Sequence, residues 1–158
     1  MDIVIDTHEL DALAARFAGS GAVIAEECER AMTETAIFIQ SRARENAPKD
    51  MGVLTNSIGY EVNPFQATVT AGTNLTYAAT MEYGRAPGSA MPPQGALLPW
   101  MGRHGIDLSL EYVIRRAIAR KGIVGKRYMQ RALEAAQAGP AQNFFNLAMQ
   151  RAAGRLGG

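Results

Sequence analysis

The sequence predicts an α+β fold, with a small antiparallel β-sheet packed against a long N-terminal helix and C-terminal helices, and with a long Pro/Gly-rich loop. Three observations predict it. Helical periodicity covers residues 7–46 and 107–153, strand-like alternation is confined to residues 56–84, and four of the seven prolines lie in residues 85–105. A length of 158 residues suits one domain, so we expect a single domain over residues 1–158.

Composition excludes several classes of protein. A hydrophobic fraction of 47% with 20% charged residues is typical of a folded globular chain rather than a disordered one. The single cysteine, Cys28, excludes an intramolecular disulfide and multi-thiolate zinc sites. The chain has no run of 18 apolar residues and begins without the pattern of a signal peptide, so we expect a soluble, non-exported protein with no membrane contact.

The first predicted helix begins near residue 7. Asp6 followed by Glu9 is typical of a capping box. Leu10, Leu13, Ala14 and Phe17 then recur at helical spacing, and Gly19-Ser20-Gly21 predicts an interruption.

A longer helix is expected from Ala22 to Asn46, because this stretch lacks Gly and Pro and is followed by Pro48. One stripe of this helix, predicted to be buried, holds Ile24, Cys28, Ala31, Thr35, Phe38 and Arg42. Free cysteine behaves as a small hydrophobe, so Cys28 is expected in the core. The charged residues predicted to face water are Glu26, Glu27, Glu29, Arg30 and Glu34.

Residues 56–84 are predicted to form the sheet. Apolar residues alternate over 58–62 and over 67–71, and Asn63-Pro64-Phe65-Gln66 between them indicates the turn of a β-hairpin. Gly72-Thr73-Asn74 closes the hairpin, and residues 77–83 form a strand or a helical turn that ends at Gly84. We expect the sheet to pack against the long helix and against the helix over 107–121.

The C-terminal part is predicted to be helical. Asp107 or Ser109 caps a helix that Gly122 ends, with an apolar stripe at Leu110, Val113, Ile114, Ala117 and Ile118. A helix from Tyr128 is broken by Gly139-Pro140, and a last helix covers about 141–153. The tail over residues 154–158 is expected to fray.

Few residues carry a signature of catalysis or of metal binding. His8 and His104 have no second ligand at helical spacing, and no nucleophile motif of a hydrolase is present, so we expect no catalytic residue, metal or cofactor and no enzymatic activity. Arg120 and Arg127 stand where a Walker A loop needs Gly and Ser or Thr, which excludes that loop.

The segment over residues 120–127 is the best candidate for a nucleic-acid contact. Its Gly122-Ile123-Val124-Gly125 between cations is similar to the backbone-clamping loop of KH domains, although a helix C-cap followed by a solvated turn explains the same residues. The cations that would contact nucleic acid are Arg115, Arg116, Arg120, Lys121, Lys126 and Arg127, with Arg131 farther along the chain.

The Pro-rich loop over residues 85–105 is the candidate partner surface. Long irregular loops are uncommon unless functional, and aromatic and Met side chains are enriched in interface cores. The alternative is a loop that folds back on its own sheet. The predicted interface residues are Tyr77, Glu82, Tyr83, Arg85, Met91, Leu97, Leu98, Trp100 and Met101.

Charge is distributed unevenly along the chain. Residues 1–100 hold six Lys/Arg against twelve Asp/Glu, for a net charge of −6, whereas residues 101–158 hold ten against three, for +7. Such asymmetry suits nucleic-acid binding, or a head-to-tail assembly in which acidic and basic surfaces of neighbouring copies meet.

In order and spacing, four short motifs resemble the tail-completion family of long-tailed bacteriophages, which includes minor tail protein Z-like neck proteins. Met51 and Asn56 stand where that family usually has Thr and Arg. The motifs here are Ala47-Pro48, Gly52-Val53-Leu54-Thr55-Asn56-Ser57-Ile58, Tyr77-Ala78 with Glu82-Tyr83-Gly84, and Tyr128-Met129 with Ala132-Leu133.

This resemblance implies a structural virion protein of the head–tail junction, located in the tail or neck and assembled in the host cytoplasm. It implies a homo-oligomeric ring, guessed to be a hexamer, around the DNA channel, with tail terminator, tail tube and head–tail connector proteins as neighbours and no sequence readout of the DNA. The alternative function is a nucleic-acid-binding protein that uses the basic residues 115–131.

Overall fold

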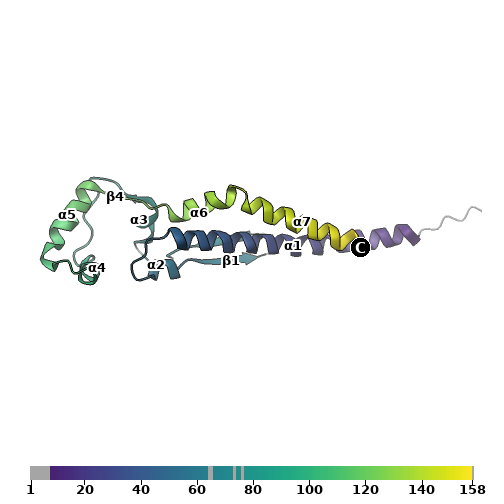
Figure 1. Ribbon diagram of the computed structural model, residues 1–158, viewed down its shortest axis with the longest axis horizontal. Coiled ribbons are helices and arrows are strands. Elements are labelled where there is room, and N and C mark those ends of the chain that lie inside the picture. The colour runs from purple at the N-terminus through teal and green to yellow at the C-terminus, as the bar shows by residue number, and fades with distance from the viewer. Residues whose placement is uncertain (1–7, 64–65, 73, 76, 158) are drawn as a thin grey trace, which may run out of the picture.

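The computed structural model describes residues 8–63, 66–72, 74–75 and 77–157, with the backbone alone for residues 8–17 and 63. The predicted cap at Asp6, the turn residues Pro64 and Phe65, and Thr73 lie outside the described residues. The described chain is an elongated α+β molecule in which long helices form a rod and a smaller group of elements lies beyond one end of it (Figure 1).

Helix α1 (His8–Asn46) runs the length of the rod, and α6 (Tyr128–Gln137) and α7 (Pro140–Gly157) return antiparallel along it (Figure 1). The helices bury mainly alanine, and this set of small side chains is called the alanine seam below. Small side chains at a helix contact allow the axes to approach closely. The alanine seam consists of Ala31, Ala36 and Ala43 of α1, Ala132 and Ala136 of α6, and Ala148 and Ala152 of α7.

Helix α1 continues through Gly19-Ser20-Gly21, so the predicted interruption there is wrong. Each glycine costs about 1 kcal/mol relative to alanine inside a helix. That cost is small beside the packing of the rest of α1 against α6 and α7. A Cβ added at Gly19 or Gly21 would meet no atom within 4 Å, so neither glycine serves a close contact.

Two members of the predicted buried stripe of α1 face solvent. Ile24 and Arg42 are exposed, and the Arg42 guanidinium lies 5.3 Å from the centre of the Phe38 ring. Cys28 is half-buried rather than fully in the core. Phe38 packs edge-on against Phe144 of α7, with ring centres 6.3 Å apart.

The predicted hairpin is confirmed. Strands β1 (Gly59–Asn63) and β2 (Gln66–Thr70) pair antiparallel from Gly59 opposite Thr70 to Asn63 opposite Gln66, and they lie along α1. Arg44 and Gln40 of α1 both donate to the carbonyl of Ile58, at 2.8 and 2.9 Å. Short helices flank the hairpin, α2 (Val53–Asn56) and α3 (Ala78–Tyr83), so the sheet is shorter than the predicted 56–84.

A cluster of buried hydrophobic residues lies where the hairpin, α2, α3 and α6 meet the C-terminal end of α1. Ile58 and Tyr128 are its largest fully buried side chains. Burial raises the pKa of the Tyr128 hydroxyl, with a smaller contribution from the nearby Glu82 carboxylate. The cluster is Ala43, Ala47, Leu54, Ile58, Ala78, Tyr128 and Ala132.

The predicted loop and the next helix form a group of elements beyond the rod (Figure 1). It is entered by β3 (Gly84–Arg85) and left by β4 (Ile123–Val124), and it contains α4 (Leu98–Arg103), the 3-10 helix η1 (Leu108–Leu110) and α5 (Glu111–Lys121). We call residues 86–121 the distal module. The expectation that the 107–121 helix packs against the hairpin sheet is wrong, because β3 and β4 carry α5 away from it.

Asp107 caps η1, as the sequence predicts, because its carboxylate accepts a hydrogen bond from the Ser109 amide at 2.9 Å. This bond lowers the pKa of Asp107. Gly122 ends α5 with φ 74°, and α6 and α7 are separated at 138–139, near the predicted break.

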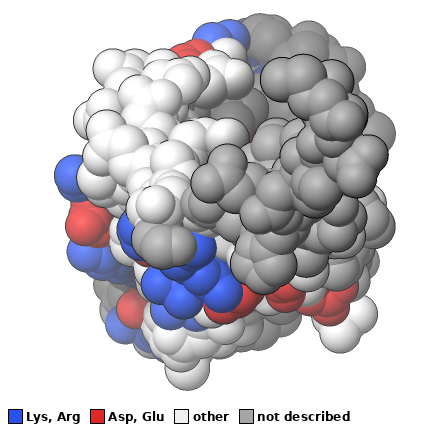
Figure 2. All heavy atoms as spheres, turned by 90° about the vertical axis from the view of Figure 1, so that its right-hand side faces the viewer, with Lys and Arg blue, Asp and Glu red and all other residues white. Residues whose placement is uncertain are grey.

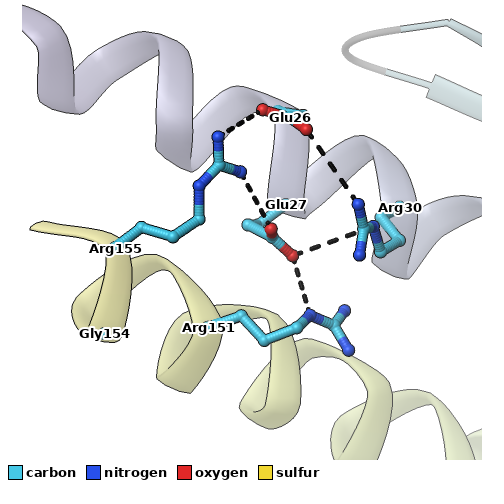
Figure 3. A pocket seen from close by; sticks show the side chains of 6 residues that line it. All are labelled: Glu26, Glu27, Arg30, Arg151, Gly154 and Arg155. Atoms are coloured by element: carbon cyan, nitrogen blue, oxygen red, sulfur yellow. Dashed lines mark hydrogen bonds and ion pairs between the residues drawn. The ribbon is translucent and has the colours of Figure 1, made fainter.

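Glu27 does not face water, which corrects the sequence prediction; it is 2% exposed. Arg151 Nε donates to its Oε2 at 2.7 Å, and Arg155 Nη1 donates to its Oε1 at 3.0 Å (Figure 3). Arg155 also bonds Glu26 at 2.9 Å, and Arg30 Nε lies 3.9 Å from Glu27. The bonds from Arg151 and Arg155 lower the pKa of Glu27 despite its burial.

These residues and Gly154 line a shallow, open hollow between α1 and α7. Seen along the rod from the end at which α1 projects, basic and acidic side chains lie side by side (Figure 2). The tail predicted to fray is helical as far as Gly157, because the Arg155 guanidinium holds this last turn against α1.

We expect Glu27→Gln to lower the melting temperature by several degrees near neutral pH, because it leaves Arg151 and Arg155 without a buried charge partner. The pKa of Glu27 lies below its ordinary value of 4.5. Its stabilisation is therefore complete above that pH and is lost as the pH falls through the lowered pKa. The difference from the wild type should shrink on acidification below about pH 4.5.

Thermal melts followed by circular dichroism at neutral and acidic pH measure this effect. Glu45→Gln is the control, because Glu45 is exposed and its ion pair among the described residues is with Arg42 of its own helix, at 2.8 Å. An equal difference between wild type and Glu27→Gln at neutral and strongly acidic pH would contradict the assignment.

Candidate interaction surface

The chain enters and leaves the distal module through the paired strands β3 and β4 and the residues beside them, Gly122 and 125–127, which we call the neck. Three glycines, Gly84, Gly122 and Gly125, allow its two strands to approach closely. Gly84 pairs with Val124 and Arg85 with Ile123. A Cβ at Gly84 would lie 2.4 Å from the Ile123 carbonyl oxygen, one at Gly122 2.3 Å from that of Arg85, and one at Gly125 2.4 Å from that of Glu82. Only glycine permits this approach of backbone to backbone.

Glu82 holds the rod side of the neck. Its carboxylate is buried and accepts hydrogen bonds from the amides of Met129 at 2.9 Å and Gln130 at 3.0 Å, so it caps the first turn of α6. Its carbonyl accepts from the Arg127 amide at 3.0 Å. This predicted interface residue therefore positions α6, a role that local sequence does not reveal because the two segments lie far apart in the chain.

The Pro-rich loop is ordered by its own chain, and it packs on α5 rather than on the sheet. The Glu111 carboxylate accepts from the Gly95 amide at 2.6 Å, and Arg115 Nε donates to the Pro92 carbonyl at 2.7 Å. Arg85 donates to the Ala90 carbonyl. Met101 is fully buried, so it fills the interior of the distal module instead of its surface.

A second contact ties the distal module to the rod. Arg103 of α4 pairs with Asp50, which follows α1, at 2.5 Å, and His104 Nε2 lies 3.9 Å from the same carboxylate. The Arg103 hydrogen bond lowers the pKa of Asp50, with smaller contributions from the charges of Arg103 and His104. Trp100 stacks near His104, with ring centres 4.8 Å apart.

Several predicted interface residues are exposed on the distal module and beside the neck. Met91, Leu98 and Trp100 are exposed, and Leu97 is half-buried. Tyr77 and Tyr83 are exposed at α3, Tyr83 to 83%. The module surface thus presents large apolar side chains that this chain leaves uncovered.

Sequence reasoning missed four residues of this surface, because it placed Leu110 and Val113 in the apolar stripe of α5 and gave Leu108 and Tyr112 no role. Periodicity identifies an amphipathic helix but not the surface that covers it. The exposed apolar residues on η1 and α5 are Leu108, Leu110, Tyr112 and Val113.

The predicted nucleic-acid residues lie on α5 and at the neck. Arg115 bonds the Pro92 carbonyl and is half-buried. Lys126 and Arg127 use their backbone amides to bond Met81 and Glu82, so residues 122–127 build the neck rather than a free phosphate-clamping loop. Among these predicted residues, Arg116, Arg120, Lys121, Lys126 and Arg127 are exposed and have no carboxylate partner among the described residues.

Other kinds of site find no support in the part of the chain that the structure describes. No group of three or more His, Cys, Asp or Glu side chains is placed there to hold a metal ion. None of the described helices is long and apolar enough to cross a bilayer.

Residues 11–84 match a family model described as "Bacteriophage HK97-gp10, putative tail-component". The match covers most of α1, the hairpin and α3, and it ends where the neck begins. No curated protein and no solved structure matched the chain. This part of the chain is therefore similar to a family of phage tail components, and the match does not single out the Z-like tail-completion group.

We expect Gly125→Ala to destabilise the protein by about 1–3 kcal/mol, because the added Cβ would press on the Glu82 carbonyl oxygen and force the strands of the neck apart. Gly102→Ala is the matched control, since a Cβ there meets no atom within 4 Å. Urea unfolding of both variants gives the comparison. Equal midpoints for Gly125→Ala and Gly102→Ala would refute the close packing of the neck.

Proposed function

We propose that this protein is a structural component of a bacteriophage tail that acts at the head–tail junction. In this proposal copies form a ring, as a hexamer, around the DNA channel, and each distal module contacts a neighbouring subunit. Its axial neighbours are tail terminator, tail tube and head–tail connector proteins, and the DNA passes without sequence readout. The protein is then part of the virion after assembly in the host cytoplasm, and it performs no catalysis.

One observation carries the proposal: the distal module projects from the rod and leaves Met91, Leu98 and Trp100 exposed. Apolar and aromatic side chains grouped on a surface are typical of the centre of a protein interface. The likeness of residues 11–84 to phage tail components supports the tail role, and it covers most of α1, the hairpin and α3.

Nucleic-acid binding is the second candidate, and the exposed unpaired cations favour it. Residues 85–127 hold eight Lys/Arg against two Asp/Glu, for a net charge of +6. Binding through phosphates would weaken by orders of magnitude between about 50 and 200 mM salt. Fluorescence anisotropy of labelled DNA across that range distinguishes it from a protein that only surrounds DNA.

Replacing residues 86–122 by Asn-Gly should leave a folded rod that no longer enters particles. Arg85 pairs with Ile123, so a two-residue turn can close the hairpin that remains. The buried cluster around Ile58 and Tyr128 lies entirely outside the deleted segment. Circular dichroism measures folding, and complementation of a phage lacking this gene product measures incorporation; normal particles from the deletion variant would contradict the proposal.

Substituting Met91, Leu98 and Trp100 by serine together should abolish incorporation while changing the melting temperature little, since all three are exposed. The control replaces three exposed apolar residues of the rod by serine, Leu133, Leu147 and Met149. The same complementation assay compares the two. Equal loss of incorporation in both variants would show that the effect is not specific to the distal module.

A further inference from the structure

The outer face of α5 combines cations with apolar side chains. One side of α5 faces the Pro-rich loop and is buried or half-buried; it holds Glu111, Ile114, Arg115 and Ile118. The opposite side of the same helix is exposed, with Tyr112 at 57% and Val113 at 59%. The outer face of α5 is defined by Tyr112, Val113, Arg116, Ala117, Arg120 and Lys121.

The cations of this face differ from three arginines near the far end of the rod in having no carboxylate beside them. Arg30, Arg151 and Arg155 are all held by Glu26 or Glu27, at distances between 2.7 and 4.0 Å. Arg116, Arg120 and Lys121 have no such partner among the described residues. Three adjacent positive charges repel one another, so an acidic partner would stabilise this face.

The chain carries an acidic segment at its other end. Residues 1–17 hold four Asp/Glu against one Arg, of which Glu9, Asp11 and Arg16 lie in the first turns of α1, and Leu10, Leu13, Ala14 and Phe17 recur there at helical spacing in the sequence. The backbone of α1 begins at His8, and its first turns extend past the end of α7, at the opposite end of the molecule from α5 (Figure 1). This segment therefore carries acidic residues that can pair with the cations of the outer face of α5, and apolar residues that can pack on Tyr112 and Val113.

We propose that the outer face of α5 binds the first turns of α1 of a second copy of this chain. The proposal rests on the proposed function and names the contact that joins its subunits. Because the two surfaces differ and lie at opposite ends, the contact is head-to-tail and repeats from copy to copy, which closes a ring if the rotation allows. Val113 and Tyr112 receive apolar residues of the arriving helix, and Arg116 and Arg120 face its acidic residues.

Nucleic acid fits this face less well. A phosphate backbone would neutralise Arg116, Arg120 and Lys121, but it would leave Val113 beside charged oxygens with nothing apolar to cover it. An acidic amphipathic helix satisfies both kinds of side chain at once. The face therefore favours a helix of a second copy, and DNA is treated as an outcome of the test.

Charge reversal in the full-length chain tests the contact. The variants are Arg116→Glu with Arg120→Glu, Glu9→Lys with Asp11→Lys, and all four together; Lys49→Glu with Arg131→Glu is the control, because both are exposed cations outside the face. Sedimentation equilibrium at low salt measures self-association. Each reversed pair should weaken it about tenfold or more, the fourfold variant should restore it, and the control should change it little.

Each other result would overturn the contact. A wild type that stays monomeric across the concentration series, a reversal of α5 without effect, or a fourfold variant that does not recover would each do so. Salt-sensitive binding of a labelled DNA duplex that Arg116→Glu with Arg120→Glu abolishes, without any self-association, would assign the face to nucleic acid instead. These results leave the tail role to be judged by incorporation into particles, so the two failures are distinguishable.

Discussion

The close approach of α1 to α6 and α7 through the alanine seam is the constraint on which the rest of the structure depends. Alanine on facing helices brings two backbones together without a thick core, so the rod is long and narrow. Such a rod buries few large side chains, and Ile58, Tyr128 and their neighbours gather at the one place where the hairpin adds a second layer. Beyond that place the distal module buries Met101, whereas many of its other large apolar side chains stay exposed.

Local features of the fold could be predicted from the sequence because neighbouring residues determine them. The β1–β2 hairpin, the cap at Asp107 and the stop at Gly122 each depend on a few consecutive residues and are confirmed. Features that depend on which surfaces meet could not be predicted. Glu27 is predicted to face solvent because its partner Arg151 lies 124 residues away in the sequence. The apolar stripe of α5 is predicted to face the core because the sequence does not reveal that the neck places α5 away from the rod.

The same distinction between local features and contacts of distant segments applies to the candidate interaction surface. The sequence predicts a partner surface on an irregular loop over residues 85–105, part of which is helix α4 in the structure. Met91, Leu98 and Trp100 are exposed there, and contact with another chain stays a proposal. Glu82 and Met101 face inward because of hydrogen bonds and packing with distant segments. The positive charge of the C-terminal part is also distributed unevenly. The arginines at the end of α7 pair with the acidic face of α1, whereas many of the unpaired cations lie on α5 and the neck.

The ion pair between Arg103 and Asp50 affects how the distal module can tilt relative to the rod. Among the described residues, the distal module is joined to the rod by the paired residues of β3 and β4 and by this exposed ion pair with Asp50, which follows α1. Tilting the module about the neck changes the distance between the two charged groups, so the pair opposes such a tilt. Because both side chains are exposed, this opposition is weak and decreases as the salt concentration rises.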